Sequence, residues 1–462
     1  MLSFLRNEPA RLRREFRDTL TLAAPLVLGQ LSAIGMNVVD TVLAGHYNAA
    51  TLAAVAVGTS IWSLVIVAAI GVMLALPPSV AQLAGGGEHA RIGALFRQAL
   101  WLALALGLLL FVGVRHADPL LRAIGIDSSI VENTQKFLHA LSWGAPALTG
   151  YFALRGLSEG LALTRPTMYF GVLGLLALAP IGYVLMYGGF GLPPRGAQGL
   201  GLATAAVLWL QLAAFAAYIG LRRHYRVFAP FARFEWPQSD TILGLLGLGV
   251  PMGVAVLMEA GLFVAAALLM GALGATTVAS HQIAINVASV AFMLPLGVAM
   301  ATTVRVGRAV GRGDADGVRY AGFVGIAVSL ATQTLSCAAM ALLPHRIAAL
   351  YTDDAGVAAL AAQLLLLAAV FQFSDGVQVT ANGALRGLKD TTVPMAITTL
   401  AYWGIGMPVG WWLAFHAGMG ARGMWIGLIA GLSAAAALLF VRFSRLAQRY
   451  RAPPTSSLPD MA

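Results

Sequence analysis

Apolar segments long enough to cross a membrane follow one another along this chain of 462 residues. A helix needs about 20 apolar residues to cross a hydrocarbon core of about 30 Å. Charged residues make up 10% of the chain and hydrophobic residues 59%, whereas about a quarter of the residues in a soluble domain are charged. These values exclude a disordered chain and a water-soluble enzyme, and the single cysteine, Cys337, excludes an intrachain disulfide. The sequence predicts an all-α integral membrane protein.

Twelve such segments lie between charged, glycine and proline residues, and each is predicted to be a transmembrane helix. The helices are expected at residues 20–45, 51–76, 96–114, 130–153, 167–189, 199–221, 242–271, 276–303, 319–343, 356–382, 394–416 and 421–443. An even number of crossings places both chain ends on the same side of the membrane.

Lysine and arginine residues fall mainly on one side of these helices. If the N-terminus is cytoplasmic, 23 of the 29 lie in the tails and cytoplasmic connections, and the others include Arg122, Arg195 and Arg346. Short loops rich in positive charge stay in the cytoplasm, so both termini are predicted to be cytoplasmic. The same distribution explains the formal net charge of +10, and no nucleic-acid partner is expected.

The second half of the chain repeats the first. At one constant offset, Pro25 matches Pro251, Gly35 matches Gly261, Gly45 matches Gly271 and Gly71 matches Gly297. Leu-Arg-Gly-Leu at 154–157 recurs at 385–388, and Pro166 and Pro180 recur at a nearly equal offset as Pro394 and Pro408. Because the offset spans six helices, both halves keep the same orientation. This parallel repeat predicts two pseudo-symmetric six-helix lobes, with a transporter's substrate site between them.

The repeat and the charge pattern together define the predicted domains. These are an N-terminal cytoplasmic tail (1–18), an N-lobe (19–221), a cytoplasmic inter-lobe loop (222–240), a C-lobe (241–444) and a C-terminal cytoplasmic tail (445–462).

Three acidic residues, Asp40, Glu259 and Asp375, lie well inside predicted helices. On insertion scales, an acid at a helix centre costs about 2.5–3.5 kcal/mol. No lysine or arginine lies at comparable depth in the sequence, so no structural ion pair is expected. An acid in this position holds a proton or binds a cation, which is the chemistry of a carrier coupled to H⁺ or Na⁺. The alternative is a hydrogen-bonded acid without function.

Uncharged polar residues accompany these acids. Asn37 precedes Asp40 by about one turn, Gln378 follows Asp375, and Gln282, Asn286 and Ser289 form a stripe on one helix face. They are candidates for lining an ion or substrate site, and helix packing is the alternative for each. The aromatic residues, which include Trp62, Tyr402 and Trp403, are expected to anchor helices at the membrane interface.

Motifs for other chemistry are missing from the sequence. It has no P-loop, no Cys and His cluster at metal-ligand spacing, and no second acidic motif to accompany Asp353-Asp354. We therefore expect a transporter and not an enzyme, with no ATP motor and no cofactor besides a coupling ion.

Seven short motifs carry a resemblance to a known family. They are Val39-Asp40-Thr41-Val42-Leu43-Ala44-Gly45, Glu259 with Leu262-Phe263, His281-Gln282 through Asn286, Pro295, Arg305-Val306-Gly307, Asp375-Gly376-Val377-Gln378, and Gly383-Ala384-Leu385-Arg386-Gly387-Leu388-Lys389-Asp390. Together they resemble the NorM-like bacterial branch of the multidrug and toxic compound extrusion (MATE) family, along the whole chain. The resemblance implies a twelve-helix antiporter of the inner membrane that exports amphipathic, often cationic drugs and dyes in exchange for H⁺ or Na⁺.

The resemblance also assigns roles to residues. Asp40 matches the N-lobe carboxylate, with Thr204 beside it, and Glu259 and Asp375 match a C-lobe cation site that is a candidate for Na⁺. Two positions depart from the family pattern. Leu178 and Gly182 stand where asparagines usually flank the proline of the fifth helix, and Phe371 stands where a tyrosine is frequent.

The predicted function is therefore cation-coupled multidrug efflux by alternating access. The expected partners are small organic cations and the lipid bilayer, and no obligate protein partner is expected. A flippase for a lipid-linked oligosaccharide is the alternative, for which arginines at mid-membrane depth would be expected. The choice between H⁺ and Na⁺, the physiological substrate, the stoichiometry and the oligomeric state stay open at this point.

Overall fold

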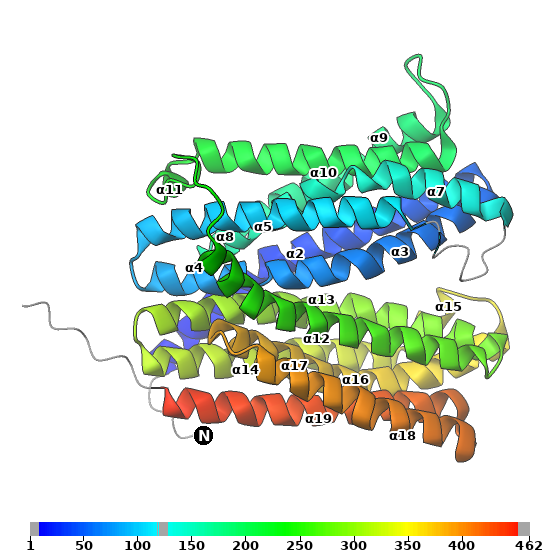
Figure 1. Ribbon diagram of the computed structural model, residues 1–462. Helices are drawn as coiled ribbons and strands as arrows, with labels where there is room; N and C mark the ends of the chain where they lie inside the picture. The colour runs from blue at the N-terminus through cyan, green and yellow to red at the C-terminus, as the bar shows by residue number, and fades with distance from the viewer. Residues whose placement is uncertain (1–8, 118, 120–127, 451–462) are drawn as a thin grey trace, which may run out of the picture. The chain divides into compact units, whose positions relative to one another are not determined.

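The computed structural model describes residues 9–117, 119 and 128–450 (Figure 1). Parts of the predicted tails, residues 1–8 and 451–462, and Arg122 lie outside the described residues. The described residues form helices and their connections, with one isolated bridge between Gly189 and Leu192.

The first half of the chain contains α2 (Pro9–Tyr47), α3 (Ala49–Met73), α4 (Leu76–Gly85), α5 (His89–Arg115), α7 (Ser128–Ser142), α8 (Ala145–Gly160), α9 (Arg165–Tyr187), α10 (Gly196–Leu221) and the short α11 (Arg223–Arg226). The second half contains α12 (Ser239–Gly271), α13 (Ala275–Gly311), α14 (Ala315–Leu342), the short α15 (Pro344–Ala349), α16 (Ala355–Gly387), α17 (Thr392–Thr399), η1 (Leu400–Gly406), α18 (Met407–Trp411), η2 (Trp412–His416) and α19 (Gly420–Arg449).

Ten helical segments of the described chain are long and apolar enough to cross a membrane. The other two of the predicted twelve are interrupted helices. The segment predicted at 130–153 is split into α7 and α8, and the segment predicted at 394–416 consists of α17, η1, α18 and η2. All twelve predicted segments are thus helical.

Proline explains both interruptions. A continuous helix over 130–153 would need the N–H of residue 146 to bond the carbonyl of Ser142, and Pro146 has no N–H. The chain instead turns at Gly144, whose N–H donates to the Leu141 carbonyl at 2.8 Å, so the prediction of an unbroken helix is wrong at this point. In the later segment Pro408 has the same effect, and the backbone widens into π-helical turns on either side of α18.

The helices pack into two compact units, which are described separately. The N-unit consists of Ala24–Val80 and His89–Leu257, and the C-unit consists of the described parts of Met1–Ala23, Ala81–Glu88 and Met258–Ala462. The lobes at 19–221 and 241–444 stay a prediction.

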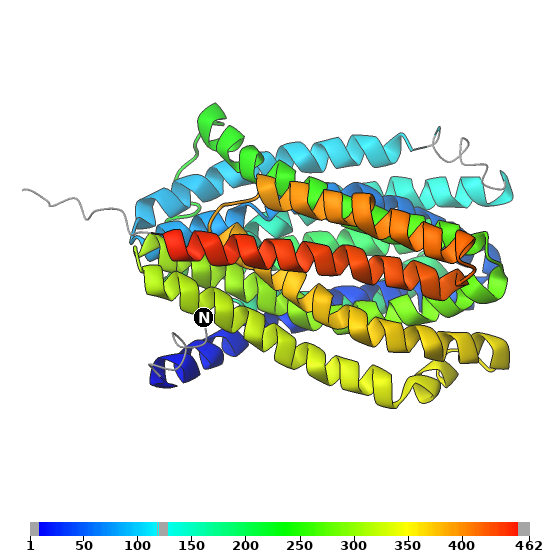
Figure 2. The ribbon, with the colours of Figure 1, turned by 90° about the horizontal axis from the view of Figure 1, so that it is seen from below.

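In the N-unit, α10 packs against α7 and α9, and α5 packs against α8. In the C-unit, α16 packs against α13, α14 and α19. Figure 2 shows α19 (red) running alongside the segmented helix from α17 to η2 (orange), which α19 contacts along its length.

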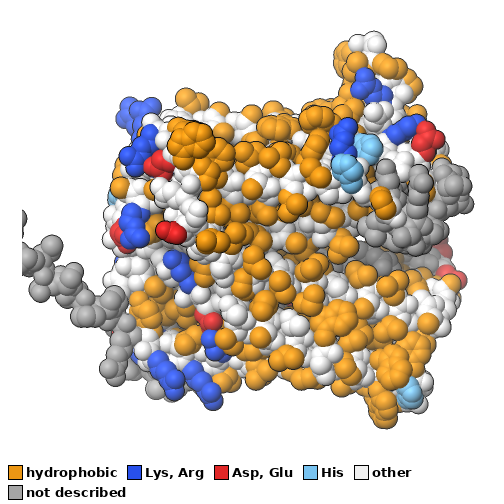
Figure 3. Space-filling model, in the orientation of Figure 1, with side chains coloured by type: hydrophobic (Ala, Val, Ile, Leu, Met, Phe, Trp, Pro, Cys, Tyr) orange, Lys and Arg blue, Asp and Glu red, His pale blue; other side chains and the backbone are white. Residues whose placement is uncertain are grey.

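Large apolar side chains remain exposed on several of the long helices, among them Leu109, Leu176, Leu268 and Leu335, each at least 67% exposed. On the face in Figure 3, hydrophobic side chains cover the middle of the helices, and Lys, Arg, Asp, Glu and His side chains gather near the helix ends. Exposed apolar side chains are unfavourable in water and favourable in hydrocarbon. A helix can enter hydrocarbon because its backbone polar groups are hydrogen-bonded within the helix. The chain is a multi-pass membrane protein.

Glycines allow the backbone of the segmented helix, from α17 to η2, to contact the backbone of α19 directly. A Cβ atom on Gly427 would lie 2.2 Å from the Gly410 Cα and 2.6 Å from the Gly406 carbonyl oxygen. Backbone atoms cannot move aside as a flexible side chain can, so residue 427 must be glycine for α18 and α19 to pack in this way.

Gly427→Ala is therefore expected to destabilise the C-unit by about 1–3 kcal/mol, the usual effect of overpacking. Gly404→Ala is the matched control, because a Cβ atom there meets nothing within 4 Å. The thermal midpoint of each purified variant in detergent checks the prediction. Equal midpoints for the two variants would show that this contact does not limit stability.

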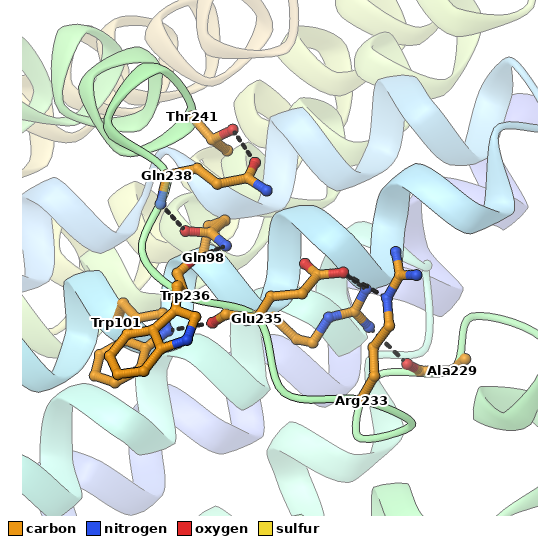
Figure 4. Close-up of polar contacts among 9 residues, drawn as sticks. Gln98, Trp101, Ala229, Arg233, Glu235, Trp236, Gln238 and Thr241 are labelled. Atoms are coloured by element: carbon orange, nitrogen blue, oxygen red, sulfur yellow. Dashed lines mark hydrogen bonds and ion pairs between the residues drawn. The ribbon is translucent and has the colours of Figure 1, made fainter.

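The connection between α10 and α12 is docked on α5 of the N-unit (Figure 4). Arg97 donates to the Glu235 carboxylate and to the Ala229 carbonyl, both at 2.8 Å, and Trp101 donates to the Glu235 carbonyl at 2.8 Å. Gln98 donates to the Trp236 carbonyl at 3.0 Å. These hydrogen bonds thus hold the predicted inter-lobe loop on α5. Hydrogen bonding by Arg97 holds the pKa of Glu235 below its ordinary value, so the ion pair persists until the pH falls through that lowered value.

Arg97→Met should release the inter-lobe loop from α5. The Arg97 and Glu235 side chains are 9% and 13% exposed, so loss of this donor leaves a nearly buried carboxylate with only the exposed Arg233 as an ionic partner. Backbone amides of 229–238 are expected to exchange with deuterium roughly tenfold faster. The control is Arg233→Met, which removes a 72% exposed partner of the same carboxylate and should change exchange less than about threefold. Equal effects of both variants would contradict this account.

Candidate ion and substrate site

The C-unit brings Glu259 and Asp375 together. Glu259 lies on α12 and is half-buried, and Asp375 lies on α16 and is 4% exposed. Their charges interact, and neither carboxylate accepts a hydrogen bond from a described residue. Two acids that share an apolar interior without donors need a proton or a cation to offset their charge.

Close packing of α14 on α16 fixes Asp375. A Cβ atom on the neighbouring Gly376 would lie 2.7 Å from Cγ of Gln333, and the Ser329 hydroxyl donates to the Gly376 carbonyl at 3.0 Å. Gln333 in turn donates to the side chain of Gln372 at 2.6 Å. This buried polar network, which the sequence did not reveal, holds the turn that carries Asp375.

Tyr402 belongs to the same site. It lies on η1, is fully buried, and interacts electrostatically with both Glu259 and Asp375. Its hydroxyl has no hydrogen-bond partner among the described residues. The prediction that Tyr402 anchors a helix at the interface is wrong, as it is for Trp62, which is 8% exposed. Trp403 is 39% exposed, and its indole N–H donates to the Met258 carbonyl at 3.1 Å.

Arg386, at the last turn of α16, also acts on this site. Its charge interacts with Glu259 and Tyr402. Among the described residues, Arg386 forms no ion pair with Glu259 or Asp375. Arg386 follows Asp375 by 11 residues, about 16 Å along the helix, but an arginine side chain is long enough to return part of that distance.

Two further predicted residues lie near Asp375 on α16. Gln378 is 1% exposed, and its Oε1 atom has no hydrogen-bond partner among the described residues. Phe371 is buried, with its ring edge-to-face against Phe263 at 6.1 Å and Trp425 at 5.8 Å between centroids. Glu259, Asp375, Gln378 and Tyr402 all carry oxygen atoms, the ligand type that suits a hard monovalent cation.

The polar stripe on α13 differs from these residues in its exposure. Gln282, Asn286 and Ser289 are exposed, whereas the adjacent His281 is buried with its ring edge-to-face against Trp425 at 5.8 Å. Among residues 9–117, 119 and 128–450, no group of three or more His, Cys, Asp and Glu side chains is placed to hold a metal ion.

Asp40 lies in the N-unit with little polar support. It is 7% exposed, and the Thr204 hydroxyl is placed 3.5 Å from its Oδ1. Leu178, where the family pattern has an asparagine, is fully buried against apolar neighbours that include Val39. Asn37 is exposed, and no hydrogen bond joins its side chain to Asp40.

Comparisons with known proteins agree with this architecture. The sequence model of the MatE family matches residues 25–184 and again residues 251–412. The two matches start as far apart as Pro25 and Pro251 and end as far apart as Pro180 and Pro408, so they reproduce the internal repeat.

Several relatives cover nearly the whole chain. A probable multidrug resistance protein NorM of Xanthomonas axonopodis pv. citri is 52% identical over 441 residues, which cover 96% of each chain. Multidrug resistance protein PmpM of Pseudomonas aeruginosa is 42% identical over 95% of this chain and 93% of its own. The crystal structure of the eukaryotic MATE transporter AtDTX14 superposes with a TM-score of 0.86 over 95% of this chain and 99% of that chain, at 19% identity. The predicted twelve-helix, two-lobe fold is thereby confirmed, and the chain belongs to the MatE family.

Proposed function

We propose that this chain is a cation-coupled multidrug efflux antiporter of a bacterial inner membrane. The observation that carries the proposal is the pair formed by the half-buried Glu259 and the buried Asp375, to which no described residue donates a hydrogen bond. The names of the two bacterial relatives, both multidrug resistance proteins, support drugs as the substrate class. An acidic, partly aromatic interior favours amphipathic organic cations, including dyes.

In this mechanism the drug and the coupling ion compete for the same carboxylates. H⁺ or Na⁺ that enters from outside neutralises Glu259 and Asp375, which lowers the affinity for a cationic drug and releases it outward. When the ion leaves to the cytoplasm, the carboxylates are charged again and bind the next drug. The ion must bind the inward-facing and outward-facing states of the transporter with different affinities, because equal affinities would not shift the equilibrium between these states.

Alternating access would move two six-helix lobes, residues 19–221 and 241–444, with both termini in the cytoplasm. The excess of arginine and lysine in one set of connections supports this orientation. We propose that Asp40 serves as a separate proton site of the N-lobe. Its support is an almost buried carboxyl group with a single long contact to Thr204.

The test is efflux of a fluorescent cationic dye from proteoliposomes that contain the purified full chain. A proton gradient and a sodium gradient are imposed separately. Uphill dye movement with one gradient and not the other would establish the antiporter and its ion. Dye movement with neither gradient, together with translocation of a lipid-linked oligosaccharide, would contradict the proposal in favour of the flippase.

A further inference from the structure

The connection between α9 and α10 in the N-unit is a short hairpin without polar side chains. Residues 188–194 read Gly-Gly-Phe-Gly-Leu-Pro-Pro, and none of these side chains carries a charge or a hydrogen-bonding group. Connections that face water are usually rich in residues such as Ser, Asn and Asp, whose side chains bond to the backbone of the turn. This hairpin therefore lacks the side chains that suit an aqueous surface.

Phe190 stands at the tip of the hairpin in a conformation that bulky residues rarely adopt. The Leu192 N–H donates to the Gly189 carbonyl at 2.9 Å, and the Gly189 N–H donates to the Leu192 carbonyl at 3.3 Å. Between them, Phe190 and Gly191 have positive φ angles of 51° and 84°. A two-residue turn of this kind normally consists of Asn or Asp followed by Gly. An aromatic residue is unfavourable for the turn itself, so any benefit of the ring comes from what it contacts.

The Phe190 ring has almost no contact with the described protein. Phe190 is 97% exposed, and Leu192 is 42% exposed. Pro193 and Pro194 continue this surface and are exposed as well. The hairpin thus presents a continuous apolar tip, a feature that marks sites of contact with a membrane or another molecule.

The base of the hairpin is fixed to the N-unit. Tyr187, the last residue of α9, donates its hydroxyl hydrogen to the Leu43 carbonyl of α2 at 2.8 Å. Its ring stacks on Tyr183 with 4.9 Å between centroids. On the other side of the hairpin, the Arg195 N–H donates to the Met186 carbonyl at 3.2 Å. The fold therefore sets the direction in which the hairpin projects.

Helix length places this base at a membrane surface. The 23 residues of α9 extend about 34 Å, and the hydrocarbon core of a bilayer is about 30 Å thick. The hairpin begins directly after α9, close to the hydrocarbon boundary. Tyr183, one turn before the end of α9 and 57% exposed, has the amphipathic ring that is typical of this depth.

The hairpin projects across the helix axes and not along them. Figure 1 shows the connection between α9 and α10 rising away from the ends of both helices, roughly at right angles to them. Figure 3 shows hydrophobic side chains on this projection. Because the helices cross the membrane, a projection at right angles to them runs along its surface, and the tip stays near the depth of the base.

We propose that the hairpin at residues 188–194 is a lateral membrane anchor, whose Phe190 and Leu192 side chains insert between lipid headgroups and acyl chains. In the orientation proposed above, the lipids belong to the outer leaflet. This boundary accepts apolar side chains and still offers water and headgroups to the backbone groups that a two-residue turn leaves without partners, which the hydrocarbon core does not. The inference goes beyond the proposed function and needs neither a drug nor a coupling ion.

The test uses nitroxide labels on the purified full chain in vesicles of phosphatidylcholine, a lipid without net charge. Cys337→Ser removes the single cysteine, and the label is attached at Pro193→Cys or, in a second sample, at Leu192→Cys. Power saturation measures collisions of each label with oxygen, which concentrates in the bilayer, and with a nickel chelate, which stays in water. Both labels should collide more with oxygen than with the chelate.

Phe190→Asn removes the ring and keeps the turn, because asparagine is common at positive φ. Loss of a ring that inserts into lipid should raise collisions of the Pro193→Cys label with the chelate, relative to oxygen, about tenfold. Leu350→Asn is the matched control. It removes an 83% exposed leucine from the connection between α15 and α16 and should not change the label on the hairpin.

Three results would overturn the proposal. In the first, the labels collide mainly with the chelate although Phe190 is present. In the second, Phe190→Asn and Leu350→Asn have equal effects. In the third, dipolar broadening between labels on different molecules shows that a second copy of the chain covers the tip. The use of two label positions guards against a position that alters the fold, which a lowered thermal midpoint would reveal.

Discussion

Glu259→Gln and Asp375→Asn should each reduce gradient-driven dye efflux to the level of protein-free liposomes. Each substitution keeps the size of the side chain and removes its charge. The remaining acid can bind a drug or an ion. Ion binding to one acid, however, changes the affinity for the drug too little to couple drug movement to ion movement. The efflux assay with the imposed gradients measures this loss directly.

Asp353→Asn is the control for these variants, because Asp353 is an exposed acid of the same unit. It should transport as the wild type does. Near-normal efflux by either site variant, at equal protein content and thermal stability, would refute the carboxylate mechanism.

Asp40→Asn should lower efflux about tenfold and leave equilibrium dye binding to the C-unit unchanged. Asparagine retains the contact with Thr204 but cannot take up or release a proton, so ion coupling through this site is lost while the C-unit site remains. Thr204→Val is expected to have a smaller effect, within about fivefold, since it removes only one long hydrogen bond. Full activity of Asp40→Asn would show that this acid serves only helix packing.

Hydropathy, charge distribution and the repeat were sufficient to predict the twelve helices and their two-fold plan. They could not locate the break at Gly144, because Pro146 stands at a position that is equally acceptable in the first turn of a helix. The π-helical turns of η1 were equally hidden, since a wider backbone has no periodic signature in the sequence. Those turns place Tyr402 inside the C-unit.

The candidate site was predicted only in part. Asp40, Glu259 and Asp375 were identified because an acid inside an apolar helix is energetically costly in a membrane and therefore needs a local reason.

The most direct test of the central claim is the affinity of the purified protein for a cationic dye, measured across a range of proton and sodium concentrations. If the ion and the drug compete at Glu259 and Asp375, the apparent Kd of the wild type rises in proportion to the concentration of the coupling ion. The Kd of Glu259→Gln and Asp375→Asn should respond much less. A wild-type Kd that is independent of both ions would contradict the account.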